Sequence, residues 1–149
     1  MAPAAVFNTP RTRTKDATPI QAMSHGPTIP GIPSFKDLEE KRQWQLEHMA
    51  GAFRVFARHG YTEGMSGHIS VRDPIQRDAF WMNPLGVHFG MLKASDMILV
   101  NFDGDIIVTG SNNRPINAAG FLIHAAIHRA RPDVRPIGLS NELGRLIGT

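Results

Sequence analysis

One segment near the end of the chain is apolar on nearly every side when it is drawn as a helix. Asn117 can cap this helix, and Arg131-Pro132 closes it because the residue before a proline disfavours helical backbone. Its apolar residues cover both faces: Ala118, Ala119, Phe121, Leu122, Ile123, Ala125, Ala126 and Ile127. A helix of this kind is normally covered on two sides. We therefore expect a layered fold in which one side of this helix packs on a sheet and the other side needs a further partner.

A second helix is expected in the first half of the chain, and it is amphipathic. Ser34 and Asp37 are typical of a capped start, and Gly60 is typical of a stop. Apolar residues recur between them at helical spacing: Leu38, Leu46, Met49, Phe53 and Phe56. The charged residues that follow Leu38 occupy the other side, so this helix should bury one face only.

The stretch between the two helices has the pattern of β-strands and turns. Four segments are short and rich in β-branched or aromatic residues: His68–Arg72, Ala79–Met82, residues 97–101 and Ile106–Val108. Asp73-Pro74 separates the first two, and Asp103-Gly104 between the last two is a strong hairpin signal. A short helical turn is expected between Gly90 and Asp96. These features predict a mainly antiparallel sheet.

The first 33 residues have a different composition. They contain six prolines and no apolar periodicity, so they cannot bury enough surface to offset the entropy of ordering. We interpret residues 1–33 as a disordered, proline-rich leader. Arg11, Arg13 and Lys15 leave an organelle-targeting leader as the alternative to a cytoplasmic protein, which is the default.

Composition also excludes several classes of function. The chain has no cysteine, which rules out disulfides, thiol catalysis and cysteine-based zinc sites. It has no apolar run of the roughly 18 residues that a membrane helix needs. The net charge is +3, and basic residues are not interleaved with aromatic ones, so neither membrane nor nucleic acid is an expected partner.

Three motifs together resemble the class II aldolase/adducin domain family. They are Ser66-Gly67-His68-Ile69-Ser70-Val71-Arg72, Asn83-Pro84-Leu85-Gly86, and the helical segment that ends in Arg131-Pro132-Asp133. The resemblance implies a three-layer α/β/α fold with a mainly antiparallel central sheet. It also implies a zinc-dependent lyase that forms homo-oligomers. Such an enzyme cleaves or decarboxylates a carbon–carbon bond beside a carbonyl, in a small carbonyl or phosphorylated substrate.

The resemblance assigns six residues to a substrate or anion site: Ser66, Gly67, His68, Ser70, Asn83 and Gly86. In the family these two loops bind the substrate phosphate. Here His68 stands where the aldolases have asparagine, and Leu85 replaces a common hydroxyl residue. The alternative is purely structural, because a glycine before a strand and a Pro-x-Gly turn both form without a ligand.

The catalytic part of the family pattern is not present. Phosphosugar aldolases resemble Ser-Ser-Glu at the start of the second helix, where this chain has Ala118, Ala119 and Gly120. The His-x-His zinc motif that should follow Asp133 is replaced, and no histidine occurs after that position. We therefore predict no catalytic residue, no bound zinc and no activity for this chain.

His124 and His128 stand four residues apart, a spacing that can chelate a metal on one helical face. Two ligands rarely suffice, and the glutamate of a His-Glu-x-x-His motif is absent. We interpret His124 as a hydrogen-bonded histidine of the core.

The resemblance ends near Val134. We predict an incomplete domain over residues 34–134, with the C-terminal half of the family fold missing, and a divergent tail over residues 135–149. A shifted reading frame, a retained intron, an incorrectly assigned gene end or a real truncation would each explain this tail. Uncovered strand edges and an uncovered helix face predict poor solubility.

Ancestry among the lyases is favoured, and decarboxylases of secondary metabolism fit it. The alternative is an adducin-like domain without activity that binds proteins or itself.

Overall fold

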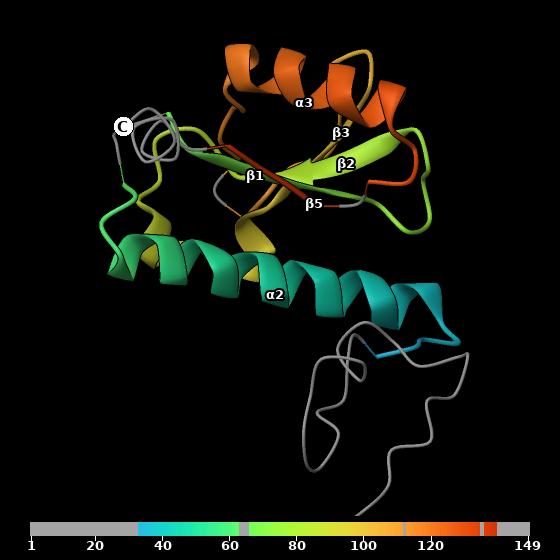
Figure 1. The fold of residues 1–149 in the computed structure, drawn as a ribbon, viewed down its shortest axis with the longest axis horizontal. Coiled ribbons are helices and arrows are strands. Elements are labelled where there is room, and N and C mark those ends of the chain that lie inside the picture. Colours follow the sequence, from blue (N-terminus) through green and yellow to red (C-terminus); the bar gives the residue numbers. More distant parts are fainter. Residues whose placement is uncertain (1–32, 63–65, 112, 135, 140–149) are drawn as a thin grey trace, which may run out of the picture. The chain divides into compact units, whose positions relative to one another are not determined.

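The computed structural model describes residues 33–62, 66–111, 113–134 and 136–139. The chain divides into two units, Met1–Ser34 and Phe35–Thr149, and the helices and strands described here belong to the second. In order they are α2 (Leu38–Arg58), β1 (His68–Arg72), β2 (Ala79–Met82), η1 (Phe89–Met91), η2 (Ala94–Asp96), β3 (Ile98–Asn101), β4 (Ile106–Val108), α3 (Ala118–Ala130) and β5 (Pro136–Leu139). Figure 1 shows α2 on one face of the sheet and α3 on the other. The predicted α/β/α class is confirmed.

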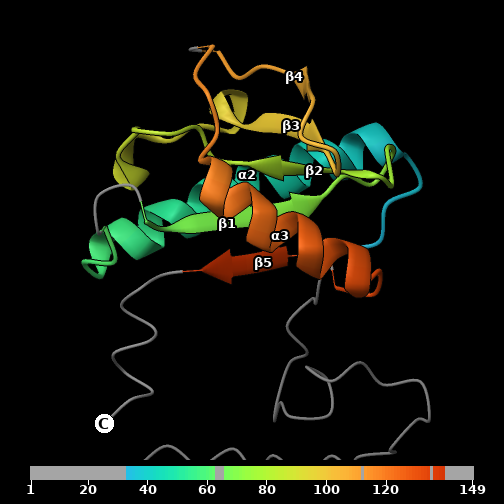
Figure 2. The same cartoon turned by 90° about the horizontal axis from the view of Figure 1, so that it is seen from above.

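Within the described ranges, five strands form one sheet in the order β4-β3-β2-β1-β5, and every neighbouring pair is antiparallel (Figure 2). Three of the four expected strands have the predicted bounds, and β3 begins one residue later than expected. β5 has no counterpart among the expected elements. It pairs with β1 along the edge, so the sheet continues beyond Val134 into the segment interpreted as a divergent tail.

The α2 side of the sheet carries the larger core. A capped start is predicted from Ser34 followed by Asp37, and in the structure Asp37 is the cap: it accepts a hydrogen bond from the Glu39 amide at 3.0 Å. The apolar face of α2 buries Leu46, Met49, Ala50 and Phe53 against residues from β1, β2, η1 and β3. Phe53 and Phe89 place their ring centroids 4.7 Å apart. This packing holds the two 3₁₀ turns against the helix.

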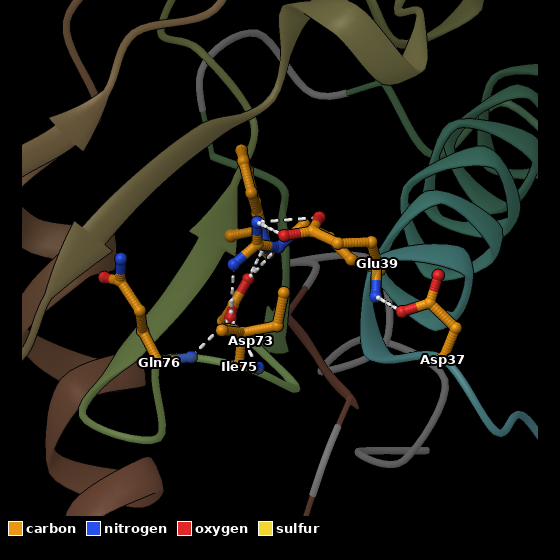
Figure 3. Close-up of polar contacts among 7 residues, drawn as sticks. Asp37, Glu39, Asp73, Ile75 and Gln76 are labelled. Carbon is orange, nitrogen blue, oxygen red and sulfur yellow. Dashed lines mark hydrogen bonds and ion pairs between the residues drawn. The ribbon is translucent and has the colours of Figure 1, made fainter.

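Asp73, at the end of β1, joins α2 to the sheet (Figure 3). Its fully buried carboxylate accepts hydrogen bonds from Arg42 Nε at 2.8 Å and from Trp81 Nε1 at 2.6 Å. The backbone amides of Ile75 and Gln76 also donate to it, at 2.8 and 2.7 Å. Burial alone would raise the pKa of Asp73, but the bonds from Arg42 and these donors outweigh burial and hold the pKa below its usual value.

The α3 side carries a smaller core. Ala125 packs with Phe80, Met82 and Val100, and Phe121 stacks on Phe80 with ring centroids 5.8 Å apart. The far side of α3 is open in the described structure: Leu122 is 67% exposed and Ile123 is 50% exposed. No helix in the described ranges combines the length and the apolar composition that a bilayer crossing requires.

Candidate functional site

Three separate loops meet at a small pocket beside the start of β1. The loop entering β1, the loop after β2 and the residue that caps α3 all contribute to its wall. The lining residues are Gly67, His68, Asn83, Pro84, Leu85, Gly86, Val87, Phe89 and Asn117. The pocket has a volume of about 10 Å³, close to the smallest space that holds one water molecule.

Backbone hydrogen bonds hold these loops in place. Leu85 donates its amide to the Pro115 carbonyl at 2.7 Å, which ties the β2 loop to the segment before α3. Gly86 has a φ of +75°, a conformation that favours glycine in this Pro-x-Gly turn. The Asn117 side chain accepts a hydrogen bond from the Gly120 amide at 3.0 Å and so caps α3, as the sequence predicts. The walls of the pocket are built by the fold rather than by a ligand.

His68 occupies the space beside Gly120. A Cβ atom at position 120 would lie 2.7 Å from the His68 ring carbon Cε1 and 2.8 Å from both ring nitrogens, closer than real side chains approach. Gly120 is therefore required for the observed position of the ring. His68 is only 6% exposed, and its Nε2 has no hydrogen-bond partner among the described residues. Burial lowers the pKa of His68, so the ring is neutral at neutral pH.

Asn83, which also lines the pocket, has a second buried polar atom without a partner among the described residues. Its side chain is 5% exposed, and Oδ1 has no hydrogen-bond partner within the described ranges. Buried polar atoms in folded proteins are normally hydrogen-bonded, so each exception calls for an explanation. Two of these exceptions belong to residues that line one pocket, at the ends of two different strands.

The structure brings together four of the six residues predicted for the site. Gly67, His68, Asn83 and Gly86 line the pocket. Ser66 is exposed and is not among the lining residues. Ser70 is fully buried on β1, where its side chain contacts α3. The assignment of these residues to substrate binding stays a prediction.

Ser70 forms part of a buried polar cluster between β1 and α3. Its Oγ lies 2.6 Å from His124 Nδ1 and 2.9 Å from His128 Nε2. His124 is thus the hydrogen-bonded core histidine that the sequence predicts. Burial is the largest cause that lowers the pKa of each ring to about 4, helped by the neighbouring imidazoles at His124 and by the Arg72 charge at His128. Both rings are neutral at pH 7 and structural in position.

Comparison with known proteins identifies the family. A family model described as the class II aldolase and adducin N-terminal domain matches residues 47–137. The chain belongs to this family. The match confirms the resemblance seen in the three sequence motifs, and it reaches into β5 of this aldolase/adducin domain.

Individual relatives agree with the family assignment. The domain is 50% identical over 106 residues to the meiotically up-regulated gene 14 protein of Schizosaccharomyces pombe, a match that covers 71% of this chain and 40% of that protein. It is 42% identical over 106 residues to decarboxylase NovR of Streptomyces niveus, covering 70% and 38% respectively. The solved structure of L-fuculose 1-phosphate aldolase from Glaciozyma antarctica PI12 is 43% identical with a TM-score of 0.71, covering 74% of this chain and 45% of that one. The chain thus spans about two fifths of the length of these two curated relatives.

The described residues of this aldolase/adducin domain do not fit a zinc site. They contain no group of three or more His, Cys, Asp or Glu side chains that could hold a metal ion. Of the histidines on β1 and α3, His124 and His128 contact Ser70, and His68 packs on Gly120. No chemical step is therefore assigned to a metal here.

A larger cavity of about 290 Å³ adjoins the pocket on the other side of Gly86 and Val87. Lys93 and Arg114 line it, together with Asp96, whose carboxylate accepts hydrogen bonds from the Lys93 amide and the Ser111 hydroxyl. Sequence reasoning missed this cavity and the Asn117 wall of the pocket. Nothing in the spacing of these residues marks them as neighbours, because η1, η2 and the segment after β4 bring them together.

Proposed function

We propose that this aldolase/adducin domain is a lyase that breaks a carbon–carbon bond beside the carbonyl of a small substrate, by aldol cleavage or by decarboxylation. The observation that carries the proposal is a pocket lined by His68 and Asn83, each of which has a buried polar atom without a partner among the described residues. The names of two similar proteins, a decarboxylase and a sugar-phosphate aldolase, support this class of reaction.

The chemistry of the pocket suits such a substrate. Cleavage beside a carbonyl requires the substrate oxygens to be held in fixed positions while the electron pair of the broken bond moves into the carbonyl group. His68 is neutral and can donate or accept a proton, and Asn83 can fix an oxygen-bearing group. The adjoining cavity with Lys93 and Arg114 has room for the rest of a small, negatively charged substrate.

Product analysis tests the proposal. The purified chain is incubated with L-fuculose 1-phosphate, a 4-hydroxy-2-oxo acid and a 3-oxo acid, and products are followed by NMR with EDTA or with added zinc chloride. Turnover of at least one compound is expected, and turnover in EDTA would show that zinc is dispensable. Absence of turnover for all three under both conditions would reject the lyase proposal and agree with the inactivity expected from the missing zinc histidines.

A second candidate function is adducin-like protein binding or self-association. The exposed apolar side chains of α3 and β4 favour it, because Leu122, Ile123 and the three residues of β4 are each at least 42% exposed. Clusters of exposed apolar side chains are typical of interaction surfaces. These exposed side chains are not among the residues that line the pocket, so the two candidate functions depend on different parts of the chain.

A further inference from the structure

Histidines occupy two of the four buried positions of α3. The buried residues of this helix are Gly120, His124, Ala125 and His128. Both rings are at most 1% exposed, and they flank the Ser70 hydroxyl of β1, whose Oγ lies 2.6 Å from His124 Nδ1 and 2.9 Å from His128 Nε2. The attachment of α3 to β1 therefore depends on two titratable groups as well as on apolar packing.

The shared hydroxyl requires neutral rings. A serine hydroxyl has a single hydrogen, so Ser70 donates to one ring nitrogen and accepts from the N–H of the other ring. A protonated imidazole carries a hydrogen on both nitrogens and can no longer accept. With both rings protonated, the Ser70 hydrogen has no acceptor in the cluster. The charge on His124 would also be buried, because its Nε2 is enclosed and has no hydrogen-bond partner among the described residues.

The charged and titratable groups around the two rings disfavour a positive charge. His68 of β1 faces His124 with ring centroids 6.0 Å apart, and Arg72 of β1 donates to the backbone carbonyl of His128. Burial is the largest cause that lowers the pKa of both rings to about 4, and the charges of His68 and Arg72 add to it. The Val134 backbone favours the charged form of His128, but burial and Arg72 outweigh it.

The other strands contribute apolar side chains to this face of the sheet. In the part of the chain that the structure describes, these are Phe80, Met82, Val100 and Ile137. The Phe80 ring lies 4.9 Å from that of His128, and Ile137 of β5 lies opposite Ser70 in the sheet. Apolar neighbours of this kind cannot solvate a charged ring.

The two faces of the sheet differ in how they respond to acid. The core on the α2 side contains twelve buried residues, against four on the α3 side. Asp73 connects α2 to the sheet through Arg42, and its pKa is held below the usual value, so this ion pair persists while the histidines gain protons. A fall in pH toward 5 therefore weakens the attachment of α3 and leaves that of α2 in place.

We propose that α3 is an acid-sensitive helix, which leaves the sheet when His124 and His128 are protonated while α2 stays packed on the opposite face. Release of α3 moves Gly120 away from His68 and removes Asn117 from the wall of the pocket. Acid thereby opens the pocket before the domain unfolds. The proposal does not depend on the reaction that the domain catalyses.

Hydrogen exchange of the full chain, followed by mass spectrometry, tests the proposal. Exchange is measured from pH 6.5 to pH 5.0 at several low urea concentrations, and the rates are corrected for the intrinsic effect of pH on amide exchange. Each ring that opening exposes raises the ratio of open to closed chain by up to about tenfold per pH unit, so the protection of α3 amides should fall by roughly a hundredfold. The α3 amides should also depend less on urea than the α2 amides, because only part of the chain opens.

Variants locate the effect. His124→Asn/His128→Gln keeps a polar group near each contact with Ser70 but cannot be protonated, so the loss of α3 protection should shrink to less than about tenfold. His59→Gln, at an exposed residue after α2, is the control and should keep the wild-type response. Should the double variant fail to fold, His128→Gln alone should halve the response on a logarithmic scale.

Three results would overturn the proposal. Equal protection and equal urea dependence of α2 and α3 would show that the domain opens only by complete unfolding. Protection of α3 that does not change between pH 6.5 and pH 5.0 would show that the rings do not control its attachment. A wild-type response in the double variant, or in His128→Gln if that variant is used, would assign the acid sensitivity to other groups.

Discussion

At the scale of single residues, the Ser70 hydroxyl is the central contact between β1 and α3. It lies within hydrogen-bond distance of both His124 and His128, and all three side chains are at most 1% exposed. Ser70→Ala would leave two buried imidazole nitrogens without a partner, and it should lower the free energy of unfolding by about 1–3 kcal/mol. Urea unfolding measures this loss. Ser66→Ala, at an exposed position, is the matched control, and equal stability of the two variants would contradict the role given to Ser70.

The same two histidines predict a pH dependence of stability. Each has a pKa of about 4 in the folded protein against 6.5 for the free side chain, so the unfolded chain binds more protons between these values. Stability should be constant above about pH 6.5 and fall as the pH drops toward 4, by up to roughly 3 kcal/mol for each ring. Urea unfolding from pH 8 to pH 4 measures the slope. His124→Gln should flatten it relative to wild type, and an unchanged slope would show that other groups cause the acid sensitivity.

At the scale of elements, Asp73 connects α2 to the sheet. Its carboxylate is fully buried and depends on Arg42 from α2 for its countercharge. Asp73→Ala leaves the part-buried Arg42 guanidinium and Trp81 Nε1 without their acceptor, and it should cost about 3–5 kcal/mol, as for other broken buried pairs. Thermal or urea unfolding measures the loss. Asp103→Ala, which breaks the exposed pair with Arg129, should leave the unfolding midpoint nearly unchanged. Similar losses of stability in both variants would contradict the role of Asp73 in connecting α2 to the sheet.

Local signals explain which elements could be predicted from the sequence. The Asp37 and Asn117 caps, the strand runs of β1 and β2, and the Asp103-Gly104 hairpin all act over a few residues. β5 escaped prediction because its sequence, Pro-Ile-Gly-Leu, contains two residues that disfavour strand interiors. Such residues are tolerated at a sheet edge, where β5 lies. The contact of His68 with Gly120 is set by the packing of α3 on β1, which no local pattern contains.

At the scale of the whole chain, the sheet and helices leave apolar surface open on the side of α3. The sequence predicts this surface, since α3 is apolar nearly all round and packs on the sheet with one side only. Leu122 and Ile123 of α3 are 67% and 50% exposed. At the edge of the sheet opposite β5, strand β4 also exposes its three residues, Ile106, Ile107 and Val108. Burial of apolar area stabilises association by about 25 cal/mol per Å², so these residues favour contact with another protein surface. We therefore expect the purified chain to self-associate as its concentration rises.

Substitution of the α3 residues tests this expectation. Leu122→Arg/Ile123→Arg should shift the chain toward monomer in sedimentation velocity at concentrations where the wild type associates, because two charges would have to be desolvated in the interface. Val55→Arg, on the exposed face of α2 at 55% exposure, places a charge on a surface that is not part of the predicted contact. It should leave association as in wild type. A monomeric wild type, or equal effects of both substitutions, would remove the structural support for self-association and leave the pocket as the remaining basis for function.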